Sequence, residues 1–165
     1  MRIAVVATLA LMSGCAGLAQ QRDSWSGIRD AAQVPQIYVD AYREGDAGRI
    51  ASLFAPEATF IPLLPMPRFK GPEAVRAYYQ HAISSTRSRS ITASNESVQD
   101  YGDVIVRTAD VVIEQTFQDG RTAATHARVS FVYRRDRDSW RIVHHHQSVR
   151  PPTPAATSGA ASGSR

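Results

Sequence analysis

The sequence predicts an α+β domain in which helices come first and pack on one face of a curved antiparallel sheet. In the first half, apolar residues recur at the spacing of amphipathic helices. After Ser90 the chain is rich in β-branched and aromatic residues, in runs separated by turn-forming sequences. Helices followed by an antiparallel meander are typical of the α+β class.

Three helices are expected before the sheet. Pro35 suits the first position of a helix, and Gly45 stops that helix. Asp46 can cap a second helix, which ends before Pro56. The third begins at residues 71–73, where Gly-Pro-Glu places a proline and an acid in the first turn.

The strands are expected around these helices and after them. Residues 62–70 hold three prolines and are expected to form a loop. Turn-forming residues separate the later runs. The expected strands are 59–61, 91–100, 104–117, 122–135 and 140–149.

Two turns determine the expected strand register. If Asp119-Gly120 is a two-residue hairpin and Arg137-Asp138 centres the next turn, Arg128 lies between Val111 and Gln147. The face turned toward the helices then combines aliphatic side chains with a few polar groups, which is typical of a ligand pocket. The pocket candidates are His126, Arg128, Ser130, His145 and Gln147.

The same register gives the sheet a second, broad apolar face. Val129, Phe131, Trp140 and Ile142 fall on it. Because the helices already cover the other face, an uncovered apolar face needs a partner. The sequence therefore predicts a homodimer through this face.

The chain resembles the nuclear transport factor 2-like superfamily over about residues 33–150. Residues 128–136 (RVSFVYRRD) and 140–148 (WRIVHHHQS) look like the SgcJ/EcaC-type, SnoaL-like proteins and the association domain of calcium/calmodulin-dependent protein kinase II. Gly45-Asp46 and Gly71-Pro72 fit the same family. The resemblance implies a cone-shaped curved sheet, with three N-terminal helices on its concave face, a pocket and a dimer or higher oligomer. The arginines of the kinase pocket have no counterpart here, so its acidic ligands are not carried over.

Catalytic and metal chemistry have weaker signals. His144 and His146 share a strand face, but no cysteine or carboxylate cluster accompanies them, so no metal site is expected. His145 near Ser130 suggests a nucleophile–base pair that lacks an acid. No nucleotide or flavin motif is visible, so no cofactor is expected. The acid–base candidates, each with a structural alternative, are Asp40, Tyr42 and Asp110.

The two ends of the chain are expected to lie outside the domain. Arg2 and an apolar run of about ten residues form a signal peptide, too short to span a bilayer. Met12-Ser13-Gly14-Cys15 resembles a bacterial lipobox, so the mature chain starts at Cys15, or at Gln20 if cleavage follows Ala19. The expected divisions are signal peptide 1–19, linker 20–33, domain 34–150 and a Pro/Gly-rich tail 151–165.

These features favour a bacterial protein exported to the periplasm or anchored as an outer-membrane lipoprotein. The net charge is +4 without a basic stripe, which argues against nucleic-acid binding. The leading interpretation is a small-ligand-binding and dimerisation domain, in which Arg128 favours a carboxylate-bearing molecule. Two alternatives are a small-molecule enzyme of the SgcJ/EcaC or ketosteroid-isomerase type and a pure oligomerisation module. The membrane is expected to be contacted only through the lipid anchor.

Lipidation at Cys15, the only cysteine of the chain, is directly testable. Labelled palmitate should enter the wild-type protein and not the Cys15→Ser variant, because the thiol is the acceptor group. A soluble mature form that begins at Gln20 would refute the anchor and leave export intact.

Overall fold

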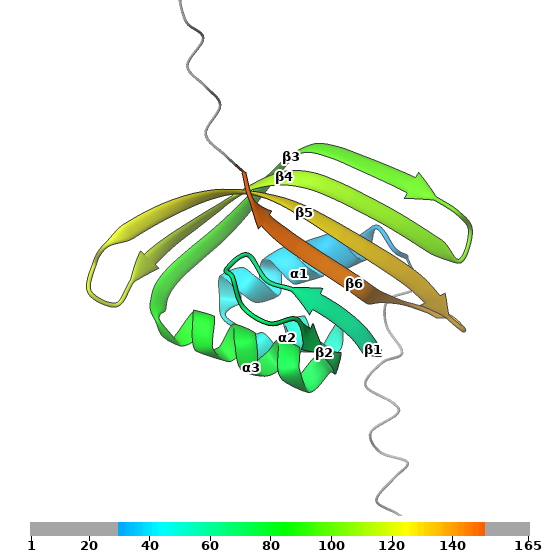
Figure 1. Cartoon of the computed structure of the whole chain (residues 1–165), viewed down its shortest axis with the longest axis horizontal. Coiled ribbons are helices and arrows are strands. Elements are labelled where there is room, and N and C mark those ends of the chain that lie inside the picture. The colour runs from blue at the N-terminus through cyan, green and yellow to red at the C-terminus, as the bar shows by residue number, and fades with distance from the viewer. Residues whose placement is uncertain (1–29, 151–165) are drawn as a thin grey trace, which may run out of the picture.

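The computed structural model describes residues 30–150, which form a curved six-stranded sheet arching over three helices (Figure 1). The predicted lipobox with Cys15, most of the linker and the tail 151–165 lie outside the described residues. Within residues 30–150, no helix is both long and apolar enough to cross a membrane. The elements are α1 (Gln33–Glu44), α2 (Ala47–Ser52), β1 (Phe54–Ile61), β2 (Phe69–Lys70), α3 (Gly71–Ser84), β3 (Thr86–Asp100), β4 (Val104–Phe117), β5 (Thr122–Asp136) and β6 (Ser139–Val149).

The predicted α+β class is confirmed, but the sheet is not wholly antiparallel. Its strand order is β2-β1-β6-β5-β4-β3, and β1 runs parallel to β6. The chain returns to β1 only in its last strand, so residues at the two ends of the domain become neighbours: Thr59 lies opposite His144, and Phe60 opposite His145. The short β2 lies inside the segment predicted to be a loop and pairs with β1.

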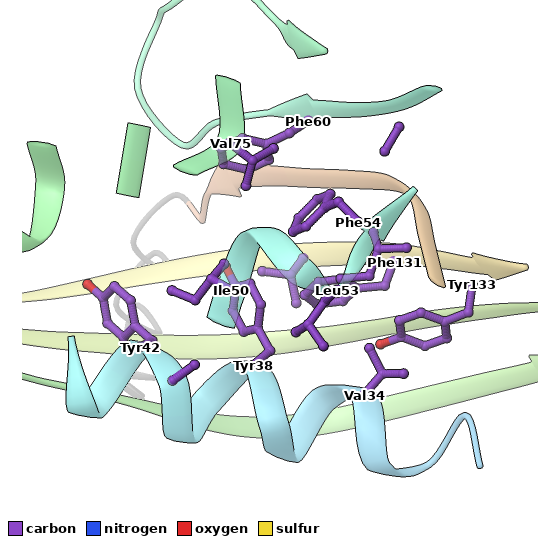
Figure 2. Packing of buried hydrophobic residues seen from close by; sticks show 14 of the residues in the cluster. Val34, Tyr38, Tyr42, Ile50, Leu53, Phe54, Phe60, Val75, Phe131 and Tyr133 are labelled. Carbon is purple, nitrogen blue, oxygen red and sulfur yellow. The ribbon is translucent and has the colours of Figure 1, made fainter. Parts of the chain in front are cut away.

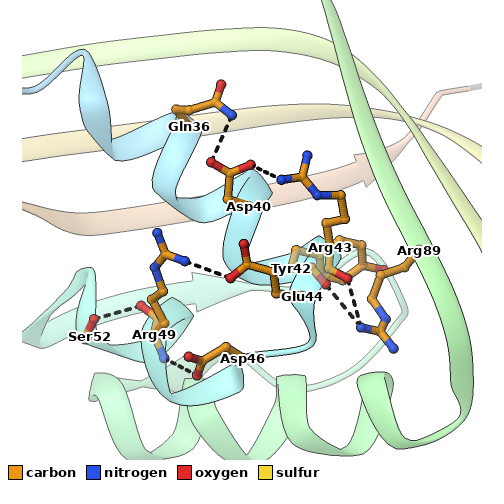
Figure 3. Close-up of polar contacts among 9 residues, drawn as sticks. All are labelled: Gln36, Asp40, Tyr42, Arg43, Glu44, Asp46, Arg49, Ser52 and Arg89. Carbon is orange, nitrogen blue, oxygen red and sulfur yellow. Dashed lines mark hydrogen bonds and ion pairs between the residues drawn. The ribbon is translucent and has the colours of Figure 1, made fainter.

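The junction between α1 and α2 has the predicted glycine at the end of the first helix and the predicted aspartate cap on the second. Gly45 adopts φ +80, and Asp46 caps α2 by accepting a hydrogen bond from the backbone N–H of Arg49 at 2.8 Å (Figure 3). Arg89 of β3 donates to the carbonyls of Tyr42 and Arg43 at the end of α1, at 3.4 Å each. A β-carbon on Gly45 would lie 2.6 Å from that guanidinium. Glycine therefore suits both the backbone angle and the arginine contact.

The core lies between the helices and the concave face of the sheet (Figure 2). Val34 and Tyr38 of α1 point toward the sheet, where Phe131 and Tyr133 of β5 receive them. Phe54 of β1 is fully buried beside them. Because α1 presents its buried residues at i, i+4 and i+8, one stripe of the helix supplies the apolar contact.

The hairpin between β4 and β5 contains one residue more than predicted. Phe117 and Arg121 close a three-residue loop: the N–H of Phe117 donates to the carbonyl of Arg121 at 2.8 Å. Gly120 takes φ +88 and donates to the carbonyl of Phe117 at 3.0 Å. Arg128 therefore pairs with Asp110 instead of Val111. A shift of one residue turns every side chain of β5 to the opposite face.

A bulge in β6 makes a second correction. The turn at Arg137-Asp138 has the predicted position, since Asp136 pairs with Ser139. The pairing then shifts at Val143, because Val132 lies opposite His144 while Tyr133 lies opposite Ile142. Trp140 and Ile142 consequently share the concave face with His145 and Gln147, where all four are buried.

The hairpin reverses the predicted faces of β5, and the bulge reverses those of Trp140 and Ile142 in β6. Val129 and Phe131, predicted at a dimer interface together with Trp140 and Ile142, are buried in the core of one chain. That interface is wrong. Arg128, predicted in the pocket, has a side chain that is 66% exposed on the convex face. The homodimer itself stays a prediction, without the residues first assigned to it.

The corrected faces can be tested with two variants of β5. Phe131→Ala should lower the free energy of unfolding by about 3–5 kcal/mol, because it leaves a cavity in the core. Arg128→Met should change it by no more than about 0.5 kcal/mol, because the side chain is largely in water. Chemical denaturation measures both. Equal effects of the two variants would contradict the register.

Candidate functional site

A partly open cavity lies between α1 and the concave face of β3–β6. Its volume is about 60 Å³, larger than the roughly 10–15 Å³ that one water needs. Apolar side chains dominate the lining, because the strands present their inward residues to it. The main ones are Val39, Ile91, Val111, Ile113, Val129 and Phe131.

Four polar side chains from α1, α3 and β6 form a buried cluster at this cavity. Tyr38, His145 and Gln147 line the cavity. Tyr79 is buried next to them but does not line it. The hydroxyls of Tyr38 and Tyr79 share a short hydrogen bond. Gln147 Nε2 lies 3.3 Å from Tyr38 Oη and 3.4 Å from Tyr79 Oη. We call these four residues the neutral cluster.

His145 is the central member of the neutral cluster and has no exposed surface. Its ring stacks on Phe131, with centroids 3.9 Å apart, and on Phe60, with centroids 5.2 Å apart. Burial among these rings lowers the pKa of His145 from 6.5 to about 3, although a hydrogen bond to the Ser130 carbonyl opposes the shift. The imidazole is therefore neutral near pH 7.

The hydrogen bond to Ser130 also determines the tautomer of His145. Nδ1 lies 3.1 Å from the Ser130 carbonyl oxygen, which can only accept, so Nδ1 carries the proton. Nε2 is then an acceptor, and it lies 3.0 Å from Gln147 Nε2. The Gln147 amide must therefore turn its NH₂ group toward His145, and its oxygen lies on the other side of the amide.

The tyrosines of the neutral cluster also keep their protons. Burial raises the pKa of Tyr38 well above its usual range, and the hydrogen bond shared with Tyr79 opposes this shift. Burial likewise raises the pKa of Tyr79. Tyr42, one turn along α1, accepts from Gln115 Nε2 at 3.1 Å, and burial raises its pKa to about 12. The cluster thus offers hydrogen bonds without a formal charge.

Among the described residues that line the cavity, the charged side chains are Glu96 and Arg107. Glu96 and Arg107 form an ion pair there, with both side chains partly exposed, so they mark where the cavity meets solvent. Nearby, the buried Tyr133 hydroxyl has no hydrogen-bond partner among the described residues. Burial raises the pKa of this phenol, while Arg107 lowers it.

The structure brings together two of the five predicted pocket residues. His145 and Gln147 line the cavity. His126 and Arg128 are exposed on the convex face, and Ser130 also faces away from the helices, because of the three-residue hairpin. Ser130 contacts His145 through its backbone carbonyl, so the suggested nucleophile–base pair is wrong.

Arg128 has a protein partner in place of a ligand. Its Nε lies 3.6 Å from the Asp110 carboxylate, which also accepts from Asn95 at 2.9 Å and from Arg150 at 3.2 Å. The hydrogen bond from Asn95 and the two guanidinium groups lower the pKa of Asp110. The prediction of a carboxylate-bearing ligand depended on Arg128 in the pocket, and Arg128 does not line the cavity.

Tyr38 and Tyr79 were missed as site residues, because each lies on the buried stripe of its helix, where a tyrosine is typical of core packing. Asp40, the acid considered on α1, instead accepts from Gln36 at 3.1 Å and from Arg43 at 2.7 Å on the helix surface (Figure 3). The histidines at 144 and 146 lie on the convex face. Across residues 30–150, no three His, Cys, Asp or Glu side chains are grouped so that they could hold a metal ion.

Comparisons with known proteins agree with this architecture. The SnoaL-like domain model matches residues 17–152. Among solved structures, a candidate calcium/calmodulin-dependent protein kinase II association domain from Xanthomonas campestris superposes with a TM-score of 0.68 at 21% identity, over 74% of this chain and 86% of that one. A nuclear transport factor 2-like superfamily protein from Salmonella enterica gives 0.66 at 23% identity, over 76% and 92%.

A third similar structure is a candidate dehydratase of the nuclear transport factor 2-like family from Streptomyces avermitilis. It superposes with a TM-score of 0.65 at 19% identity, over 72% of this chain and 93% of that one. No curated protein sequence shows significant similarity to the chain. At these sequence identities the three structures show the fold alone, so the chemistry of this chain has to be argued from its own side chains.

The buried neutral His145 should make folding stability depend on pH. Between pH 6.5 and about 3 the unfolded chain binds a proton at this residue that the folded chain does not. The free energy of unfolding should therefore fall as pH is lowered through this range, by up to about 1.4 kcal/mol per pH unit.

A His145→Phe variant provides the control for this pH dependence. It keeps the aromatic stack and removes the titration, while His144, whose pKa is also lowered by burial, and all carboxylates titrate in both proteins. Urea denaturation at pH 7, 6, 5 and 4 should show the steeper loss in the wild type. Parallel curves would show that His145 is not held neutral.

Proposed function

We propose that this chain, which belongs to the SnoaL-like domain family, binds a small and largely apolar molecule in the cavity between α1 and the sheet. One observation carries the proposal: an apolar cavity meets a neutral, hydrogen-bonding cluster formed by Tyr38, His145 and Gln147. Such a lining, with a few convergent polar groups, is typical of small-molecule sites.

The protonation states support binding better than acid–base catalysis. An effective general base needs a pKa near the working pH, whereas that of His145 is about 3. Of the cavity-lining residues in the described part of the chain, Glu96 is the one carboxylate, and it is paired with Arg107. A guest would therefore meet hydrogen-bonding groups without a basic group suited to remove a proton.

The proposal predicts that filling the cavity abolishes ligand retention. Native mass spectrometry of protein purified from its source cell should detect an added mass that denaturation releases. Ala109 lines the cavity, and Ala109→Leu should lose this mass because its larger side chain occupies the guest's space. Thermal melting would confirm that the variant folds.

A matched control is available on the neighbouring strand. Ala124→Leu makes the same chemical change at an exposed position outside the cavity and should retain the mass. A wild type without bound mass, together with an Ala109→Leu variant that melts higher than wild type, would identify an empty packing void and contradict the proposal.

Export through a Cys15 anchor and self-association stay separate proposals. The sequence motif Met12–Cys15 supports the anchor. The convex face, which no helix of the described chain covers, supports self-association (Figure 1). Neither is required for a guest to enter the cavity.

A further inference from the structure

The hydrogen-bond balance of the neutral cluster leaves one acceptor unused. The His145 tautomer requires the NH₂ group of Gln147 to face His145 Nε2, at 3.0 Å. The same NH₂ group lies within 3.4 Å of both tyrosine hydroxyls. The Gln147 amide oxygen accepts no hydrogen bond from any residue in the described part of the chain.

This unused oxygen belongs to a residue that lines the cavity and is only 7% exposed. An amide oxygen that gives up water without gaining a donor loses a hydrogen bond, so such groups normally find a partner. A guest in the cavity can supply the donor, because Gln147 is part of the wall that the guest contacts.

We infer that the guest is a neutral molecule with a hydroxyl or N–H group, which donates a hydrogen bond to Gln147 Oε1 while its apolar body lies against Val111, Val129 and Phe131. The inference rests on the proposed binding function and narrows its ligand class. A carboxylate is excluded at this end of the cavity, because its oxygens would face the amide oxygen with no cation beside them. Arg107 at the rim is already paired with Glu96.

Four probes of similar shape separate the possible ligand classes. Phenol donates a hydrogen bond, anisole can only accept one, toluene does neither, and benzoate is an anion. Their binding to the full chain can be measured by chemical-shift perturbation of the cavity-lining residues. Phenol should bind about threefold to tenfold more tightly than anisole or toluene, the gain expected from one additional hydrogen bond. Benzoate should leave these resonances unchanged.

A double variant tests which groups produce the preference. Gln147→Leu alone would expose His145 Nε2 as a substitute acceptor, so His145→Phe is combined with it. The double variant should bind phenol and toluene alike, while its affinity for toluene stays close to that of the wild type. If thermal melting shows that it does not fold, the order of the four probes on the wild type decides alone.

The outcomes distinguish this inference from the proposed function. Equal binding of phenol and toluene to the wild type, or a preference for benzoate, would overturn the donor class and leave a small-molecule site in place. The same holds if none of the probes binds while native protein retains a mass. If none binds and native protein carries no mass, the proposed function fails as well.

Discussion

The stack of His145 between Phe60 and Phe131 is the contact on which the rest of the site depends. It joins β1 to β6 and β5, a hairpin that the chain forms more than sixty residues after β1. Burial in this stack lowers the pKa of His145 to about 3, and the Ser130 carbonyl then determines which nitrogen carries the proton. The orientation of Gln147 follows from that proton. One aromatic contact thus sets the protonation and the hydrogen-bond direction at the cavity.

The sequence predicted the order and type of the elements well, because these depend on local signals. Gly45, Asp46 and Gly71 end or begin helices through their own backbone and capping chemistry. The parallel pairing of β1 with β6 was not predictable in the same way, since nothing local to β1 specifies a partner more than eighty residues later. The resemblance to a known superfamily supplied the general shape and left the register open.

The predicted strand register is wrong at two places, the hairpin between β4 and β5 and the bulge at Val143 of β6, and in each a single extra residue causes the error. Asp119-Gly120 suits both a two-residue turn and the last part of a three-residue loop, and the second occurs. The two-residue turn would place every side chain of β5 on the opposite face of the sheet. The prediction therefore put Arg128 in the pocket and Phe131 outside the core. The apolar series Val129, Phe131 and Tyr133 was the better guide, because the side facing the helices must bury the larger apolar surface. Tyr38 and Tyr79 were beyond sequence reasoning, since their meeting requires the packing of α1 against α3.

The sheet separates two kinds of polar chemistry. On its convex face, Asp110 is surrounded by Asn95, Arg128 and Arg150, and water screens these charges. On its concave face, where desolvation would make a charge costly, the polar groups are phenols, an amide and a neutral imidazole. The difference is set by solvent access, since neighbouring residues of the same strands point to opposite sides. A site built in this way discriminates by the direction of hydrogen bonds and the shape of the wall, and a charged guest would find no compensation for the water it gives up.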